Sequence, residues 1–132
     1  MESSRSLFDG GADPLQLNEQ FKLLYDGEGA PLQLNEQLKI LDSISNTMKE
    51  KYLLCTRLFK DKVLRDDGNR VVTGGEIHDL SIHTRRFDRI ISDIPRQYSS
   101  LGRDRIKELN IEYVAFKKIM DEIEGNMQIE EK

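Results

Sequence analysis

The side chains in this 132-residue sequence that could catalyse a reaction or bind a metal ion are few: two histidines and one cysteine. His78 and His83 are five positions apart on a predicted helix, which places them about 140° apart around its axis, so they cannot bind one metal ion from one face. Cys55 lies on a predicted apolar stripe, with no recognisable activating base or oxyanion hole, and is expected to be a small core residue.

Glycine and acidic residues add no further catalytic pattern. Gly10-Gly11 and Gly74-Gly75 match neither the P-loop nor the dinucleotide-binding fingerprint. The sequence contains no Glu-x-x-His pair of the kind that a di-iron helical bundle needs. We therefore predict a protein that is not an enzyme, with no catalytic, cofactor-binding or metal-binding residues, no cofactor and no small-molecule substrate.

A basic cluster is the strongest polar signal. Residues 84–107 contain seven basic side chains against three aspartates, although the whole chain has a net charge of -4. The cluster would dock an anion or an acidic partner segment, or would simply be a solvated helical surface; nucleic acid is not expected, because no aromatic residues alternate with the arginines. Its members are Arg85, Arg86, Arg89, Arg96, Arg103, Arg105 and Lys107.

Composition limits where such a protein would work. Charged residues make up 33% of the chain and hydrophobic residues 37%, and no apolar run approaches the length of about 18 residues that a membrane span needs. The first six residues lack the apolar core of a secretory signal. One cysteine cannot form an internal disulfide, which fits a reducing compartment. These features predict an intracellular protein, cytoplasmic or nuclear, without a membrane partner.

The N-terminal third contains a tandem repeat. Residues 7–23 and 24–40 are two adjoining 17-residue units that share the identical stretch PLQLNEQ. We expect the first unit to form a short helix that ends at Gly27 and Gly29, and the second to open a long helix. The first copy would fold back onto the protein or dock on a partner; a bivalent binding motif and a neutral replication slip are the alternatives.

The remainder of the chain shows three helical patterns, over residues 32–65, 76–94 and 103–127. Apolar residues recur in each at alternating spacings of three and four. Thr73 and Glu76 form a capping box before the second helix, and Asp66 to Asn69 would stop the first. The expected fold is therefore all-α: an antiparallel three-helix bundle, or a helical coiled-coil-like hairpin, with a short extra N-terminal helix.

This pattern divides the chain into an N-terminal segment over residues 1–30, a helical bundle over 31–127 and an acidic tail over 128–132. The first long helix has more apolar residues than one small bundle covers, which predicts association with other protein helices, as a homo-oligomer or in a hetero-complex. The leading interpretation is a non-catalytic interaction module, a small subunit or adaptor of a larger assembly; the alternative is an anion- or nucleic-acid-binding module that uses the basic cluster. The residues expected to contact partners are Leu17, Phe21, Leu24, Leu53, Leu58 and Val63.

Overall fold

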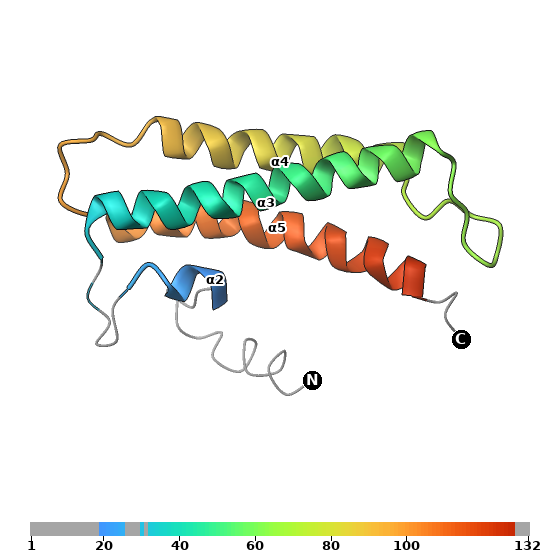
Figure 1. Cartoon of the computed structure of the whole chain (residues 1–132), viewed down its shortest axis with the longest axis horizontal. Helices are drawn as coiled ribbons and strands as arrows, with labels where there is room; N and C mark the ends of the chain where they lie inside the picture. The colour runs from blue at the N-terminus through green and yellow to red at the C-terminus, as the bar shows by residue number, and fades with distance from the viewer. Residues whose placement is uncertain (1–18, 26–29, 31, 129–132) are drawn as a thin grey trace.

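The computed structural model describes residues 19–25, 30 and 32–128, and the fold over these residues is all-α, as the sequence predicts. Figure 1 shows three long helices that lie side by side and run in alternating directions, with a short helix near the start of the first. Their bounds are α2 (Glu19–Lys22), α3 (Leu34–Lys60), α4 (Gly74–Ser92) and α5 (Arg103–Gln128).

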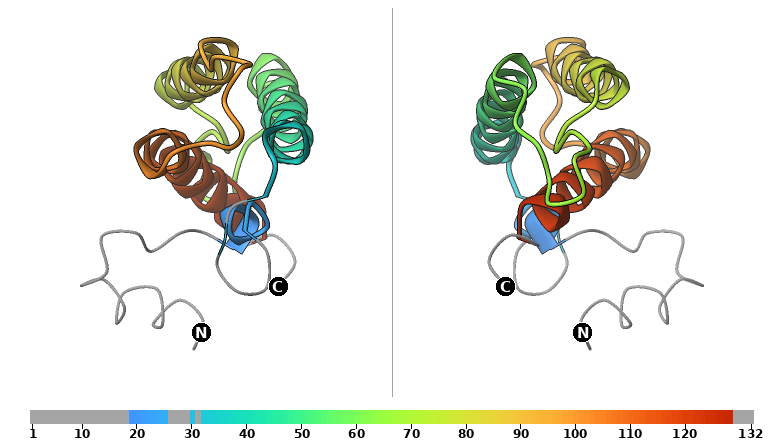
Figure 2. Two further views of the ribbon diagram at one scale, coloured as in Figure 1. Left: turned by 90° about the vertical axis from the view of Figure 1, so that its left-hand side faces the viewer. Right: turned by 90° about the vertical axis from the view of Figure 1, so that its right-hand side faces the viewer.

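The end-on views place α4 between its two long neighbours (Figure 2). Helix α4 packs against both α3 and α5, while α2 lies on the side where α3 and α5 face each other. Most of the core comes from the apolar stripes of the three long helices, because residues three and four positions apart share one helical face. On α4 this stripe is Leu80, Thr84, Phe87 and Ile91, all of them buried.

The helix expected over residues 32–65 is shorter at both ends. It begins at Leu34, whose backbone N–H donates to the carbonyl oxygen of Ser99 at 2.7 Å. It ends at Lys60, because Lys62 adopts a left-handed conformation with φ of 56°. The N–H groups of Lys62 and Val63 donate to the carbonyls of Phe59 and Leu58, which is the Schellman pattern of a helix C-terminus. Glycine usually occupies the position of Lys62, so the sequence contained no signal for this end.

The connection between α3 and α4 closes one end of the bundle. Leu64 and Arg70 form an isolated antiparallel bridge around a turn at Gly68, whose φ is 88°. Val71 and Val72 are buried, and the Asn126 side chain of α5 donates to the carbonyl of Val71 at 3.2 Å.

The expected capping box at the start of α4 is confirmed. The Thr73 hydroxyl accepts from the N–H of Glu76, and the Glu76 carboxylate accepts from the N–H of Thr73.

The two copies of the repeat adopt different structures. The second copy leads into α3, whereas the first contributes the four-residue α2. Phe21 and Leu24 are completely buried, and the Phe21 ring centroid lies 6.2 Å from that of Phe87 and 5.5 Å from that of Tyr113. This corrects the expectation that Phe21 and Leu24 face a partner: they belong to the core of this chain, beside α4 and α5. Leu17, the third residue of that predicted face, lies outside the described residues.

A buried amide joins the segments at this end of the bundle. Gln37, in the second copy, is completely buried; its side-chain nitrogen donates to the carbonyl of Leu24 at 3.3 Å. Its side-chain oxygen accepts from the N–H of Leu101 at 2.7 Å. Two further backbone bonds hold the same region, from Leu32 to Leu24 and from Leu34 to Ser99. Gln37 therefore connects α2, α3 and the turn into α5.

The burial of Phe21 predicts a large effect of its removal. Phe21→Ala should lower the free energy of unfolding by about 3–5 kcal/mol, because it deletes a buried ring and leaves a cavity. Leu23→Ala is the matched control: Leu23 is two residues away but 59% exposed, and its change should cost less than about 0.5 kcal/mol. Urea denaturation of both variants measures the difference. Equal, small effects would show that α2 does not form part of the core.

The amide of Gln37 gives a second comparison. Gln37→Ala should lower the free energy of unfolding by about 2–4 kcal/mol, because it leaves the buried Leu101 N–H without its partner, removes one of the two hydrogen bonds to the Leu24 carbonyl and leaves a cavity. Gln33→Ala, in the same repeat copy, removes an exposed amide that makes no capping hydrogen bond and should be nearly neutral. If thermal and urea unfolding show the two variants to be alike, the amide does not hold these segments together.

Candidate partner-binding surfaces

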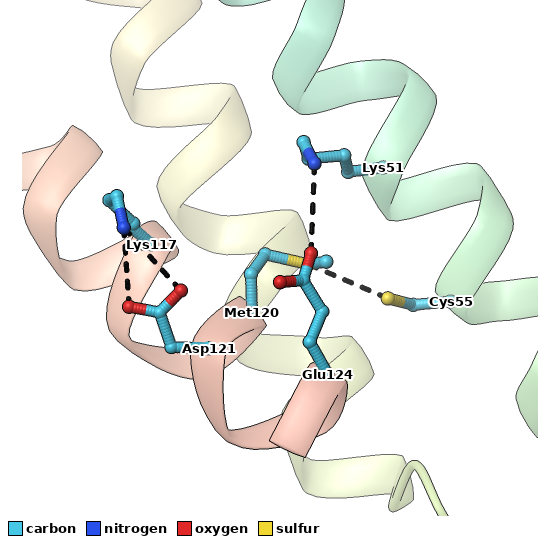
Figure 3. Close-up of polar contacts among 6 residues, drawn as sticks. All are labelled: Lys51, Cys55, Lys117, Met120, Asp121 and Glu124. Carbon is cyan, nitrogen blue, oxygen red and sulfur yellow. Dashed lines mark hydrogen bonds and ion pairs between the residues drawn. The ribbon is translucent and has the colours of Figure 1, made fainter. Parts of the chain in front are cut away.

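The one cysteine lies in the core, between α3 and α5. The Cys55 sulfur is 3.6 Å from that of Met120, and the side chain is 1% exposed. Figure 3 shows this contact below an ion pair between Lys51 and Glu124, at 3.8 Å. Burial, with a smaller effect from the charge of Glu124, raises the pKa of the Cys55 thiol from 9.0 to about 11. A thiol protonated at neutral pH is a poor nucleophile, so the surroundings of Cys55 suit packing.

The two histidines have separate surroundings. His83 lies with its Nδ1 2.7 Å from Oε1 of Glu112, and this half-buried pair links α4 to α5. His78 is exposed, near the start of α4. Over the part of the chain that the structure describes, no group of three or more histidine, cysteine or acidic side chains could hold a metal ion.

Three arginines of the basic cluster share the outward surface of α4. Arg85, Arg86 and Arg89 are exposed and line a shallow depression of about 620 Å³, together with the half-buried Ile82. These four residues are the arginine face. Asp88, Ser92 and Asp93 complete its rim. Because every lining residue belongs to one helix and its C-cap, the depression is open space between long side chains and not an enclosed site for a small molecule.

The arginine face keeps its positive charge. Arg85 donates to the hydroxyl of Ser81 at 3.0 Å, and within the described ranges none of the three arginines forms an ion pair. Asp88, the closest acidic neighbour in sequence, is held instead by α3: it accepts from Ser45 at 2.8 Å and pairs with Lys49 at 3.0 Å. Partial burial opposes its ionisation, but the contacts with Lys49 and Ser45 outweigh that effect and lower the pKa of Asp88.

The other four predicted basic residues do not line this depression. Arg96 is exposed in the turn after α4, and Arg103 and Lys107 are exposed on the first turns of α5. Arg105 is half-buried and pairs with Glu108 of its own helix at 3.5 Å. The structure therefore brings together the three arginines of α4 and distributes the remaining basic residues over two other elements.

An apolar surface lies on the second half of α3. Leu53 is 58% exposed and Leu54 is 47% exposed, and Leu58, one turn after Leu54, is half-buried against the core. These three residues are the leucine surface. Val63, also expected to contact a partner, is half-buried against the core after the helix has ended.

Sequence reasoning singled out Leu53 and Leu58 but missed two residues of these surfaces. Leu54 was not among the residues expected to contact a partner, yet no described neighbour buries it. Ile82 lies off the apolar stripe of α4, and its position opposite that stripe was the signal available for an apolar residue on the outward face.

Comparison with known proteins gives no relative: no family model matches the sequence, and searches of curated proteins and of solved structures find no significant match. Among the described helices, none is both long and apolar enough to cross a membrane.

The raised pKa of Cys55 predicts a pH-dependent stability. Because the folded thiol has the higher pKa, it contributes stability that is fully present below pH 9 and is lost as the pH rises through about 11. Between pH 9 and 11 the wild-type protein should lose up to about 2 kcal/mol more than Cys55→Ala, in which every other titrating group is unchanged. Urea unfolding at several pH values measures both slopes. Parallel slopes would contradict the prediction.

Proposed function

We propose that this protein is a non-catalytic interaction module that assembles with other protein helices through the leucine surface of α3. The observation that carries the proposal is the exposure of two adjacent leucines, Leu53 and Leu54, on a helix whose opposite face is already packed in the core. Single exposed apolar residues are ordinary, but neighbouring ones on a regular helix are typical of a surface that another element covers.

The shape of the surface supports a helical partner. Leu54 and Leu58 are four residues apart, so they form a short ridge along α3, with Leu53 beside it. Ridges of this kind fit the grooves between side chains of a second helix. Leu58 is half-buried against the core, so its side chain is already restricted in motion. A partner that contacts it therefore loses less conformational entropy on binding.

Site-specific photo-crosslinking tests this function in the cells that make the protein. A photoreactive residue at position 53 or 54 should yield one discrete adduct, whose mass identifies either a second copy of the chain or another protein. Asn46 is the matched control position, because it is exposed on α3 two turns before Leu53. Its adduct should be several-fold weaker. Positions 53 and 54 that label no better than position 46 would contradict the proposal.

A paired charge substitution gives the second arm of the test. Leu53→Glu with Leu54→Glu should abolish the complex, because it places two carboxylates on the proposed apolar contact. Ile111→Glu with Val114→Glu makes the same change at two exposed apolar residues of α5 and should leave the complex intact. The opposite result would place the contact on α5.

A further inference from the structure

We propose that the arginine face of α4 docks an acidic amphipathic helix of a partner protein. This is a second surface, on a different helix from the leucine surface, and it does not depend on the function proposed above. It rests on the charge of the face, on the placement of the nearby carboxylates and on the apolar residue between the arginines.

The charge is concentrated and available. Arg85 and Arg89 are one helical turn apart, about 6 Å along the axis, and Arg86 lies beside them. All three are exposed, in a chain whose net charge is -4. Guanidinium groups pair with carboxylates through two parallel hydrogen bonds, so a row of glutamates or aspartates with the same helical spacing is the complementary surface.

Neither carboxylate on the rim of this face pairs with its arginines within the described residues. Asp88 is three residues after Arg85, a spacing at which helical side chains can pair. Its two oxygens are instead bound by Ser45 and Lys49 of α3, at 2.8 and 3.0 Å. Asp93, four residues after Arg89, forms no ion pair with it in the described part of the chain, so the charges of Arg85 and Arg89 remain for an external anion.

The shape and composition of the face favour a protein helix over a polyphosphate. Ile82 is half-buried in the same depression, so it offers an apolar contact beside the charges. Asp93, exposed on the rim, would repel a phosphate backbone that runs continuously across the face. A partner helix avoids this repulsion because it presents carboxylates at discrete positions and an apolar side chain toward Ile82.

Fluorescence polarisation with the full chain tests the proposal. The probe is a synthetic helical peptide of about 18 residues that presents a row of glutamates beside a row of leucines. Arg85→Glu with Arg89→Glu should weaken its binding at least about tenfold, and Arg85→Gln with Arg89→Gln should weaken it less. Lys39→Glu with Lys118→Glu is the matched control, with the same change in net charge at exposed positions on α3 and α5, and should change affinity less than about twofold. Thermal unfolding confirms that each variant is folded.

Several results would overturn this assignment. They are the absence of measurable binding by the peptide, equal weakening by the control pair, and equal binding of a peptide with the same composition in scrambled order. Displacement of the peptide by an RNA duplex at lower concentration would assign the face to nucleic acid. Association of labelled with unlabelled chain that Arg85→Glu with Arg89→Glu abolishes would assign it to a second copy.

The two proposals can fail separately. Leu53→Glu with Leu54→Glu should leave binding of the acidic peptide unchanged, since it alters only the leucine surface. Loss of the complex in that variant, measured by co-purification from the same cells, with the peptide affinity intact, would show that the two surfaces are independent.

Discussion

The buried amide of Gln37 links three segments of the chain at one end of this bundle, where two backbone hydrogen bonds reinforce it. Gln37 is fully enclosed, and the cost of burying its polar atoms is offset only while the Leu24 carbonyl and the Leu101 N–H stay in place. These partners come from the segment after α2 and from the turn before α5. The position of α2, the entry into α3 and the path of the chain into α5 are therefore linked through one side chain, and Phe21 reaches α4 and α5 from a segment fixed in this way.

The sequence predicts the features of the fold that depend on local chemistry. The capping box at Thr73 and Glu76 requires two side chains three residues apart, and it forms as expected. The long helices follow from apolar spacing. The end of α3 could not be predicted, because Lys62 adopts a left-handed conformation that usually requires glycine. The burial of Phe21 in its own chain also could not be predicted from the spacing of apolar residues, since an apolar face on a short helix packs equally well on its own chain or on a partner.

The arginine face could likewise be predicted where it depends on spacing along one helix, but not where it depends on contacts between helices. Sequence spacing places Arg85, Arg86 and Arg89 on one side of a helix. It does not say that Asp88 is held by Ser45 and Lys49, because those residues are more than thirty positions away. For the same reason the net charge of residues 84–107 overestimated how many basic side chains share one surface. The basic residues of α5 belong to another element, and Arg105 already has Glu108 as its partner.

The repeat has an evolutionary consequence. Gln37 and its counterpart Gln20 arose as the same residue, yet one is enclosed and the other is exposed beside Tyr113. One position along, the second copy has the half-buried Leu38, whereas the first has Phe21 in the core. Recombination between the identical stretches could delete one unit and restore a single copy, but that product would have no Phe21. Once the ring became part of the core, the duplication ceased to be redundant, and purifying selection has a reason to retain both copies.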